Sequence, residues 1–220
     1  MSWHPLLLSF EVATIATLLA TIAGVALATL LALRRFPGRD LLDVIVTTPM
    51  VLPPTVLGYY VLVVLGRRST IGQAYEDLTG SSIVFTRTGA IVAASIGAFP
   101  LIVKGARAAL QGVDPTLIRA AYTLGAGRLR AYFAIRIPLA APGILAGVML
   151  GFARALGDFG VTLMVAGDIP GETQTASLAI YDAIQADRQG DAAGMIAVLS
   201  ALAIVTLYAV NKLTRSPHDE

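Results

Sequence analysis

The stretch "RAAYTLGAGRLRAYFAIRIPLAAPGI", from Arg119 to Ile144, carries four arginines and no acidic residue. It lies between two long apolar segments and is interrupted by glycines and prolines. Asp114 and Pro115 precede it and predict a helix start, because aspartate caps helix N-termini and proline fits the first helical position. We expect a short helix up to Leu124 that ends at Gly125 and is too short to cross a membrane.

One face of this short helix is predicted to be apolar. Leu117, Ala120, Ala121 and Leu124 recur at three- and four-residue spacing, which is typical of a shared helix face. The alanines keep the middle of that face small, so a partner can approach it closely. The alternative is an interfacial helix that lies on lipid head groups, with its arginines on the phosphates.

The composition of the whole chain indicates a polytopic membrane protein. Of its 220 residues, 56% are hydrophobic and 14% are charged, and the mean hydropathy is +0.75. Soluble domains carry about a quarter charged residues. The absence of cysteine excludes disulfides and thiolate metal sites, and a net charge of +2 does not favour a nucleic-acid partner. The N-terminus lacks the basic region and small-residue cleavage site of a signal peptide, so we do not expect one to be removed.

Five apolar runs are long enough to cross about 30 Å of hydrocarbon, so the predicted fold class is all-α. The runs cover residues 12–33, 44–65, 89–110, 142–166 and 192–210. The segment 5–10 either lengthens the first run or precedes it as an interfacial helix, which leaves a sixth span open.

The basic residues of the connections alternate between two sides. One side holds Arg34, Arg35, Arg39, Lys104, Arg107, the arginines of the opening stretch, Lys212 and Arg215. The other side holds Arg67, Arg68, Arg87 and Arg188, together with Asp168, Glu172, Asp182, Asp187 and Asp191. The positive-inside rule places the first set in the cytoplasm, so the N-terminus is expected outside and the C-terminus inside.

The segment from Arg119 to Pro138 resembles the cytoplasmic signature of permease subunits of ABC importers. That signature is Glu-Ala-Ala, three residues, Gly, nine residues, Ile-x-Leu-Pro. The matching residues are Ala120, Ala121, Gly125, Ile135 and Pro138, while Arg119 stands in place of Glu and Ile137 in place of Leu. The resemblance implies a coupling helix that docks on an ATP-binding subunit. Its contact residues are expected to be Asp114, Leu117, Arg119, Ala120, Ala121, Leu124 and Gly125. The reversed charge at Arg119 means that the ion pair of the usual Glu is not implied.

Three longer stretches, 36–68, 120–133 and 152–181, resemble the molybdate type of ABC-importer permease, whose relatives carry tungstate, sulfate and thiosulfate. The resemblance covers residues 8–210 and implies the type I importer permease fold. It also implies a second copy of the chain, two ATP-binding subunits that hold ATP and Mg, and an extracytoplasmic oxyanion-binding protein. The chain lacks a G-x-x-x-x-G-K-[ST] loop, so we expect neither enzyme activity nor a cofactor in the chain itself.

Small residues recur along the first apolar run at four-residue spacing. They are Ala16, Ala20, Gly24, Ala28 and Ala32. Such stripes let helix backbones approach closely. The stripe is interpreted either as packing within the chain or as a seam between two copies.

The second and fourth runs carry the residues expected at the transport pathway. Pro49, Pro53, Pro54 and Gly58 interrupt the second run, and freed carbonyls inside a membrane need partners. The pathway candidates are Pro53, Pro54, Thr55, Arg154, Gly157 and Asp158. The prolines either form a gate or only bend the helix. Arg154 and Asp158 either neutralise each other or leave the arginine free to attract a dianion.

Segment 167–191 is expected outside the membrane, where it meets the binding protein or serves as a polar connector. Thr175 or Ser177 is predicted to cap a short helix through Ile184. The transmembrane domain is expected to cover 8–211, and 212–220 to form a short cytoplasmic tail without a regulatory domain.

Two other classes of membrane protein fit the sequence less well than the permease. An ion-coupled secondary transporter needs membrane carboxylates and usually repeats, and only Asp158 lies deep in a run. A membrane enzyme subunit needs ligand histidines within spans, but His4 and His218 lie at the chain ends. The sequence leaves the choice among molybdate, tungstate and sulfate open.

Overall fold

A computed structural model describes residues 3–34 and 36–214, and these residues form helices and connecting loops. The tail expected over 212–220 therefore lies outside the described residues from 215 onward. The helices are α1 (His4–Leu33), α2 (Arg39–Val51), α3 (Pro54–Leu65), α4 (Thr70–Thr79), α5 (Arg87–Gly112), α6 (Pro115–Thr123), α7 (Arg128–Ala131), the π-helix η1 (Tyr132–Arg136), α8 (Ile137–Leu156), α9 (Gly160–Ala166), α10 (Ala176–Gln185) and α11 (Gln189–Thr214).

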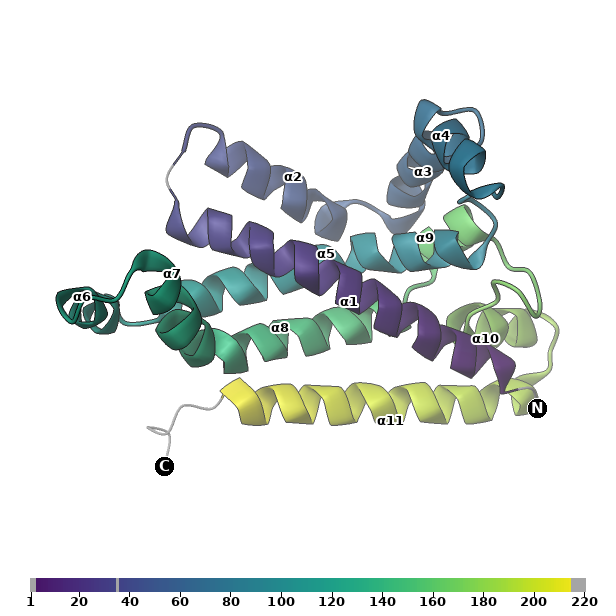
Figure 1. Ribbon diagram of the computed structural model, residues 1–220. Coiled ribbons are helices and arrows are strands. Elements are labelled where there is room, and N and C mark those ends of the chain that lie inside the picture. Colours follow the sequence, from purple (N-terminus) through teal and green to yellow (C-terminus); the bar gives the residue numbers. More distant parts are fainter. Residues whose placement is uncertain (1–2, 35, 215–220) are drawn as a thin grey trace.

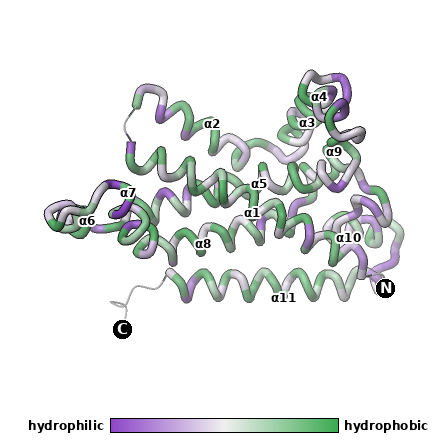
Figure 2. Tube along the Cα trace, in the orientation of Figure 1, coloured by the Kyte–Doolittle hydropathy of each residue, from purple (hydrophilic) through white to green (hydrophobic). Residues whose placement is uncertain are grey.

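Four long apolar helices form the body of the molecule. They are α1, α5, the continuous α7–η1–α8 segment and α11, and each is long enough to cross a membrane. They lie roughly along one direction, with α5 packed between α1 and α8 (Figure 1). In Figure 2 apolar residues run along these helices, while hydrophilic residues gather mainly at the two ends of the bundle. This distribution fits a bundle whose middle lies in hydrocarbon.

The first predicted run begins earlier than expected, because α1 starts at His4 and includes the segment 5–10 without a break. The interfacial alternative for that segment was therefore wrong. In the small-residue stripe of α1, Ala16, Ala20, Gly24 and Ala28 are buried within the chain. A Cβ placed on Gly24 would lie 3.1 Å from Cγ2 of Ile102 on α5. The stripe therefore packs α1 on α5, as the first of the two interpretations held.

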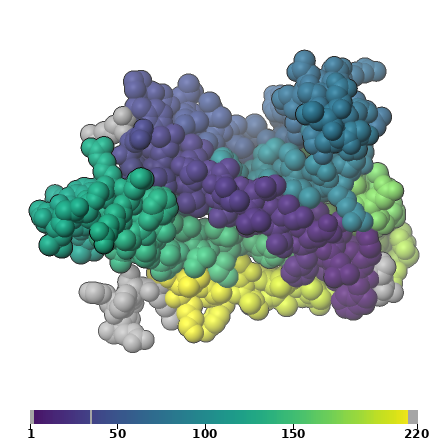
Figure 3. Space-filling model, in the orientation of Figure 1, coloured from purple at the N-terminus to yellow at the C-terminus, as the bar shows by residue number. Residues whose placement is uncertain are grey.

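The second predicted run, 44–65, is not one straight helix. It is divided into α2 and α3, which are bent by 116° relative to each other. The break falls at Leu52, whose backbone is extended, and at Pro53, which cannot donate the next helical hydrogen bond. Pro49 lies inside α2 without ending it. In Figure 3 the α2 and α3–α4 segments form two separate lobes above α1, with a notch between them.

The fourth predicted run, 142–166, has different bounds in the structure. The helix is continuous from Arg128 to Leu156, and α9 is a separate short helix. The helix passes Pro138 because the π turn just before it is wider than an α turn, which relieves the clash between a proline ring and the carbonyl four residues back. It ends at Leu156 with Gly157 as its C-cap, so Asp158 lies in the connection to α9 rather than within the helix.

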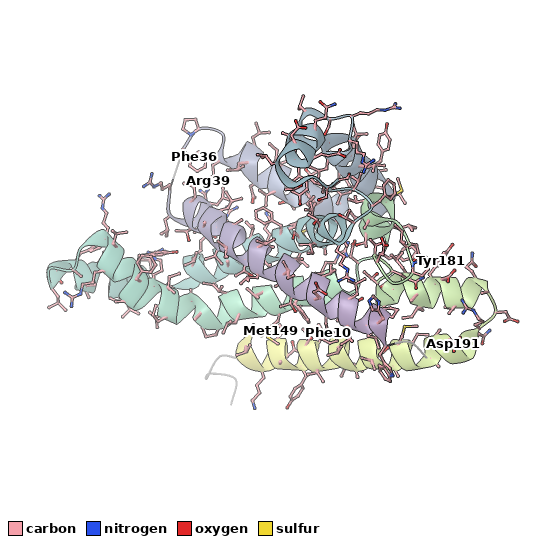
Figure 4. The ribbon with its side chains drawn as sticks, turned by 45° about the vertical axis from the view of Figure 1, so that its right-hand side comes forward. Phe10, Phe36, Arg39, Met149, Tyr181 and Asp191 are labelled. Carbon is pink, nitrogen blue, oxygen red and sulfur yellow. The ribbon has the colours of Figure 1, made fainter. Side chains whose placement is uncertain are left out.

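The two ends of the bundle differ in the segments that they hold. One end holds α6, α7 and the end of α11, and the other holds the start of α1 and α10 (Figure 1). In Figure 4 Phe36, between α1 and α2, and Arg39, the first residue of α2, lie far from Tyr181 on α10 and Asp191 on α11. The helices therefore separate the connections into two groups, as the alternation of basic residues predicted.

Candidate coupling surface and transport pathway

Helix α6 begins and ends at the residues that the sequence predicted. The Asp114 carboxylate accepts hydrogen bonds from the Thr116 backbone N–H, at 2.8 Å, and from the Thr116 hydroxyl. These hydrogen bonds hold the pKa of Asp114 below its ordinary value of 3.8, and the bond from the hydroxyl is a larger cause than the bond from the N–H. At the other end Gly125 has a φ of +82°. The N–H groups of Gly125 and Ala126 donate to the carbonyls of Tyr122 and Ala121, which forms a Schellman motif.

The predicted apolar face of α6 divides into two. Leu117 and Leu124 are 48% and 88% exposed, and Ala120 is exposed beside them. Ala121, in contrast, is 6% exposed and lies with Ile118 against the rest of the chain. The four residues share one side of the helix as predicted, but Ala121 lies at the edge next to Ile118 and is covered by the rest of the chain, so only the other three are exposed. We call Leu117, Ala120 and Leu124 the α6 outer face.

Arg119 points away from the protein core, like the α6 outer face, and is exposed. Among the ion pairs of the described residues none includes it. This exposed apolar surface lies next to a cation without an ion pair, on a helix capped at both ends, and is therefore a candidate contact surface.

Arg154 and Asp158 form an ion pair at the break between α8 and α9. Nη1 of Arg154 lies 2.8 Å from Oδ1 of Asp158. The other carboxylate oxygen accepts from the Thr162 backbone N–H at 2.9 Å and from the Thr162 hydroxyl at 2.7 Å. The Asp158 side chain is 1% exposed and that of Arg154 is 36% exposed. Asp158 thus neutralises the arginine and also satisfies the N-terminus of α9, where the N-cap Phe159 makes no side-chain bond.

The depth of this pair follows from its neighbour on α5. A Cβ placed on Gly97 would lie 3.6 Å from Cζ of Arg154. Gly97 is ten residues from Arg87, the start of α5. At 1.5 Å per residue this is about 15 Å along the helix, well inside an apolar layer about 30 Å thick. The pair is therefore in the middle of the bundle, where an unpaired charge is expensive.

The proline candidates lie at the elbow between α2 and α3. Pro53, Pro54 and Thr55 are exposed there. Pro54 packs on α9, since a Cβ placed on Gly160 would lie 2.7 Å from the Pro54 Cβ. Gly58 makes the next contact, with a built Cβ 2.6 Å from the Met164 Cβ. The elbow is therefore joined through α9 to the ion pair at Asp158.

Gly157, the remaining candidate, faces elsewhere. It lines a hollow of about 280 Å³ between α8 and α11, together with Leu199 and Ser200 of α11. The structure thus brings five of the six pathway candidates to one region formed by the elbow, α9 and the end of α8. Gly157 instead faces α11.

Residues 20–215 match the family model described as binding-protein-dependent transport system inner membrane component. The chain belongs to this family of membrane transport proteins. Among its relatives, the molybdenum transport system permease protein ModB of Escherichia coli (strain K12) is 44% identical over 97% of this chain and 93% of that protein. The putative molybdenum transport system permease protein YvgM of Bacillus subtilis (strain 168) is 36% identical over 94% of this chain and 92% of that protein. The sulfate transport system permease protein CysT of Salmonella typhimurium is 32% identical over 91% of this chain and 72% of that protein.

The solved structures agree with this assignment at the level of the fold. The chain resembles a structure described as inward facing conformations of the MetNI methionine ABC transporter, with a TM-score of 0.69 and 17% identity, over 98% of this chain and 100% of the other. The all-α bundle with four to five spans is therefore the type I ABC importer permease fold, as the sequence predicted. The permease is a component of the inner membrane. Its family supports neither an ion-coupled secondary transporter nor a membrane enzyme subunit.

One charged cluster of the permease was missed from the sequence. Asp43 on α2 contacts two cations of α5. Its Oδ1 lies 2.9 Å from Lys104 Nζ and 2.8 Å from Arg107 Nη1. The three side chains are between 20% and 40% exposed. The signal was present, because Lys104 and Arg107 are one helical turn apart, but only the tertiary structure places α2 beside them.

On the opposite side of the permease, α10 begins at Ala176 as expected, but its N-terminus is satisfied differently. The predicted cap Thr175 holds the N-cap position without a side-chain bond, and Ser177 lies within the helix. Instead the hydroxyl of Ser9 on α1 accepts the hydrogen bond of the Ala176 N–H, at 2.7 Å. The capping prediction was therefore wrong, and the contact ties α10 to the start of α1.

Proposed function

We propose that this chain is the membrane subunit of an ATP-driven importer for a tetrahedral oxyanion, with molybdate as the cargo. The observation that carries the proposal is the 44% identity to a molybdenum permease along almost the whole of both chains. The sulfate permease of Salmonella typhimurium is less similar, at 32%, and the alignment covers a smaller share of that protein. Sulfate and tungstate are therefore the alternative cargoes.

The transport pathway is proposed to lie between two copies of the chain. Four or five spans are few to enclose a polar path alone. The elbow residues Pro53, Pro54 and Thr55 are exposed, and Arg154, which is linked to the elbow through Asp158 and α9, keeps about a third of its side chain exposed. A second copy laid over this region covers the elbow and leaves the arginine facing the passing anion. The Asp158 carboxylate keeps that arginine from binding the anion too tightly to release it.

The ATP-binding subunit is proposed to dock on α6. The α6 outer face provides exposed leucines at both ends of a two-turn helix, and Arg119 adds a positive charge beside them. Asp114 and Gly125 serve as caps that hold this helix rigid, so a displacement of the ATPase moves the helix as a unit. Ala121 contributes indirectly, because its small buried side chain lets α6 pack closely against the rest of its own chain.

The orientation proposed is N-terminus outside and C-terminus in the cytoplasm. It places α6 with the cytoplasmic ATPase and α10 with the extracytoplasmic binding protein. Segment 167–191 carries more acidic than basic residues, which suits contact with a protein rather than capture of the anion.

The test is uptake of radiolabelled molybdate by vesicles that contain the chain, its ATP-binding subunit and the binding protein. We expect uptake that needs ATP and is reduced by excess unlabelled molybdate more than by sulfate. Equal uptake without ATP contradicts an ATP-driven importer, and stronger competition by sulfate assigns the cargo to sulfate.

The docking surface has a matched pair of variants. Leu124 on α6 is 88% exposed and Leu78 on α4 is 87% exposed, so aspartate at either position meets solvent equally. Leu124→Asp is expected to lose the co-purifying ATPase, while Leu78→Asp keeps it. Retention of the ATPase by both variants contradicts docking on α6.

A further inference from the structure

A basic hollow of about 710 Å³ lies between the C-terminal end of α1 and the α6–η1 segment. Arg34, Arg128 and Arg136 line it, and its lining contains no acidic residue of the described chain. The ion pairs among the described residues include none of these three arginines. The hollow therefore has a positive charge that the described protein does not neutralise, and its volume lies within the range of about 300–1,000 Å³ of ligand sites.

The wall formed by α7 and η1 is ordered by two contacts. Arg128, Tyr132 and Arg136 follow one another at four-residue spacing and line the same hollow. The Tyr132 hydroxyl lies 2.6 Å from the Thr29 hydroxyl of α1. Nη1 of Arg136 donates to the Leu110 carbonyl at 3.4 Å. These bonds position the wall while the guanidinium groups keep most of their donors available.

Apolar side chains line the same hollow beside the cations. Leu30 and Leu33 of α1 are 37% and 40% exposed, and Leu129 and Phe133 on the opposite wall are 75% and 65% exposed. A small hydrated anion needs the arginines but not these side chains. A ligand with both an anionic head and an apolar tail uses both, so the chemistry favours an amphiphile over a free ion.

We propose that this hollow binds the phosphate head group of an anionic phospholipid. The phosphate contacts Arg34, Arg128 and Arg136, and the acyl chains lie along Leu33 and Phe133. The inference rests on the proposed orientation, which places this end of the bundle at the cytoplasmic leaflet, where anionic lipids meet basic pockets between helices. The bound lipid joins the end of α1 to the segment that follows α6, and so stabilises the base of the coupling helix.

The test uses the full chain, purified in mild detergent with the subunits that accompany it. Bound lipids are counted by native mass spectrometry during titration with dioleoyl phosphatidylglycerol or dioleoyl phosphatidylcholine. Each of Arg34→Gln, Arg128→Gln and Arg136→Gln is expected to weaken phosphatidylglycerol binding about fivefold, and the triple variant to abolish it. The control is Arg130→Gln, an exposed arginine of α7 that does not line the hollow and is expected to bind normally.

Several results would overturn the proposal. Equal binding of the two lipids, or equal loss in Arg130→Gln, means that the arginines do not form a specific site. Displacement of phosphatidylglycerol by millimolar inorganic phosphate means that the site takes a free anion. Loss of the lipid whenever the ATPase is bound means that the hollow belongs to the protein interface. The measurement needs neither cargo nor ATP, so its outcome is separate from that of the uptake experiment.

Discussion

Replacement of either member of the Arg154–Asp158 ion pair is expected to destabilise the permease. The Asp158 carboxylate accepts three hydrogen bonds, one from Arg154 at 2.8 Å and two from Thr162 at 2.9 and 2.7 Å. Asp158→Ala leaves all three donors without this acceptor, whereas Arg154→Met removes one bond and leaves the carboxylate with the two from Thr162.

The size of each loss follows from burial. Removal of one partner of a buried ion pair costs about 3–5 kcal/mol. Because Arg154 is 36% exposed, its orphaned charge is partly solvated, and the lower end of that range applies to Asp158→Ala. At about 2–4 °C per kcal/mol for a chain of this size, the melting temperature should fall by about 6–12 °C. Arg154→Met keeps the two bonds from Thr162 but leaves the Asp158 carboxylate, which is 1% exposed, without a cation, so no discount for exposure applies and its shift should be at least as large.

The assay is thermal unfolding of the purified permease in detergent, with uptake per assembled complex as the second measurement. A double replacement by leucine cannot separate the possible roles of the pair, because it also removes the acceptor for Thr162. The combination Arg154→Met with Asp158→Asn keeps a carbonyl oxygen for Thr162 and removes both charges. We expect it to recover most of the lost stability, so uptake then reports whether Arg154 serves the anion. A melting shift for Arg154→Met much smaller than that for Asp158→Ala would refute the argument from burial.

Three further variants test the local geometry. Gly125→Val places a β-branched residue at a φ of +82°, which should cost about 1–2 kcal/mol and reduce ATPase binding. Gly125→Asn should be tolerated, and normal ATPase binding by the valine variant contradicts docking on α6. Gly160→Val adds a side chain where even a built Cβ would lie 2.7 Å from the Pro54 Cβ, so overpacking worth about 1–3 kcal/mol should lower the melting temperature and reduce uptake. An unchanged melting temperature and unchanged uptake would mean that the elbow does not pack against α9. Asp43→Ala leaves two cations of α5 unpaired and should lower the melting temperature, whereas Asp40→Ala, which makes no ion pair among the described residues, should not; equal effects argue against the cluster.

The sequence alone determined the class of the protein and the position of α6, the helix proposed for coupling. Runs of apolar residues and glycine or proline signals act locally, within one or two turns of the chain. For this reason the bounds of α6, the caps at Asp114 and Gly125, and the positions of α5 and α11 could be predicted from neighbouring residues. The signature around Ala120 supplied the family in the same local way.

The tertiary structure decided what depends on residues far apart in the chain. Ser9 replaces Thr175 as the hydrogen-bond acceptor at α10, and Asp43 finds its cations on α5, because helix packing brings together groups separated by more than fifty residues. Packing also turned Ala121 inward with Ile118 and left Leu124 exposed. Hydrophobicity makes all three side chains suitable for burial, so the pattern does not say which of them the rest of the chain will cover. That choice depends on the surfaces that α1 and α5 present, and only the folded bundle defines them.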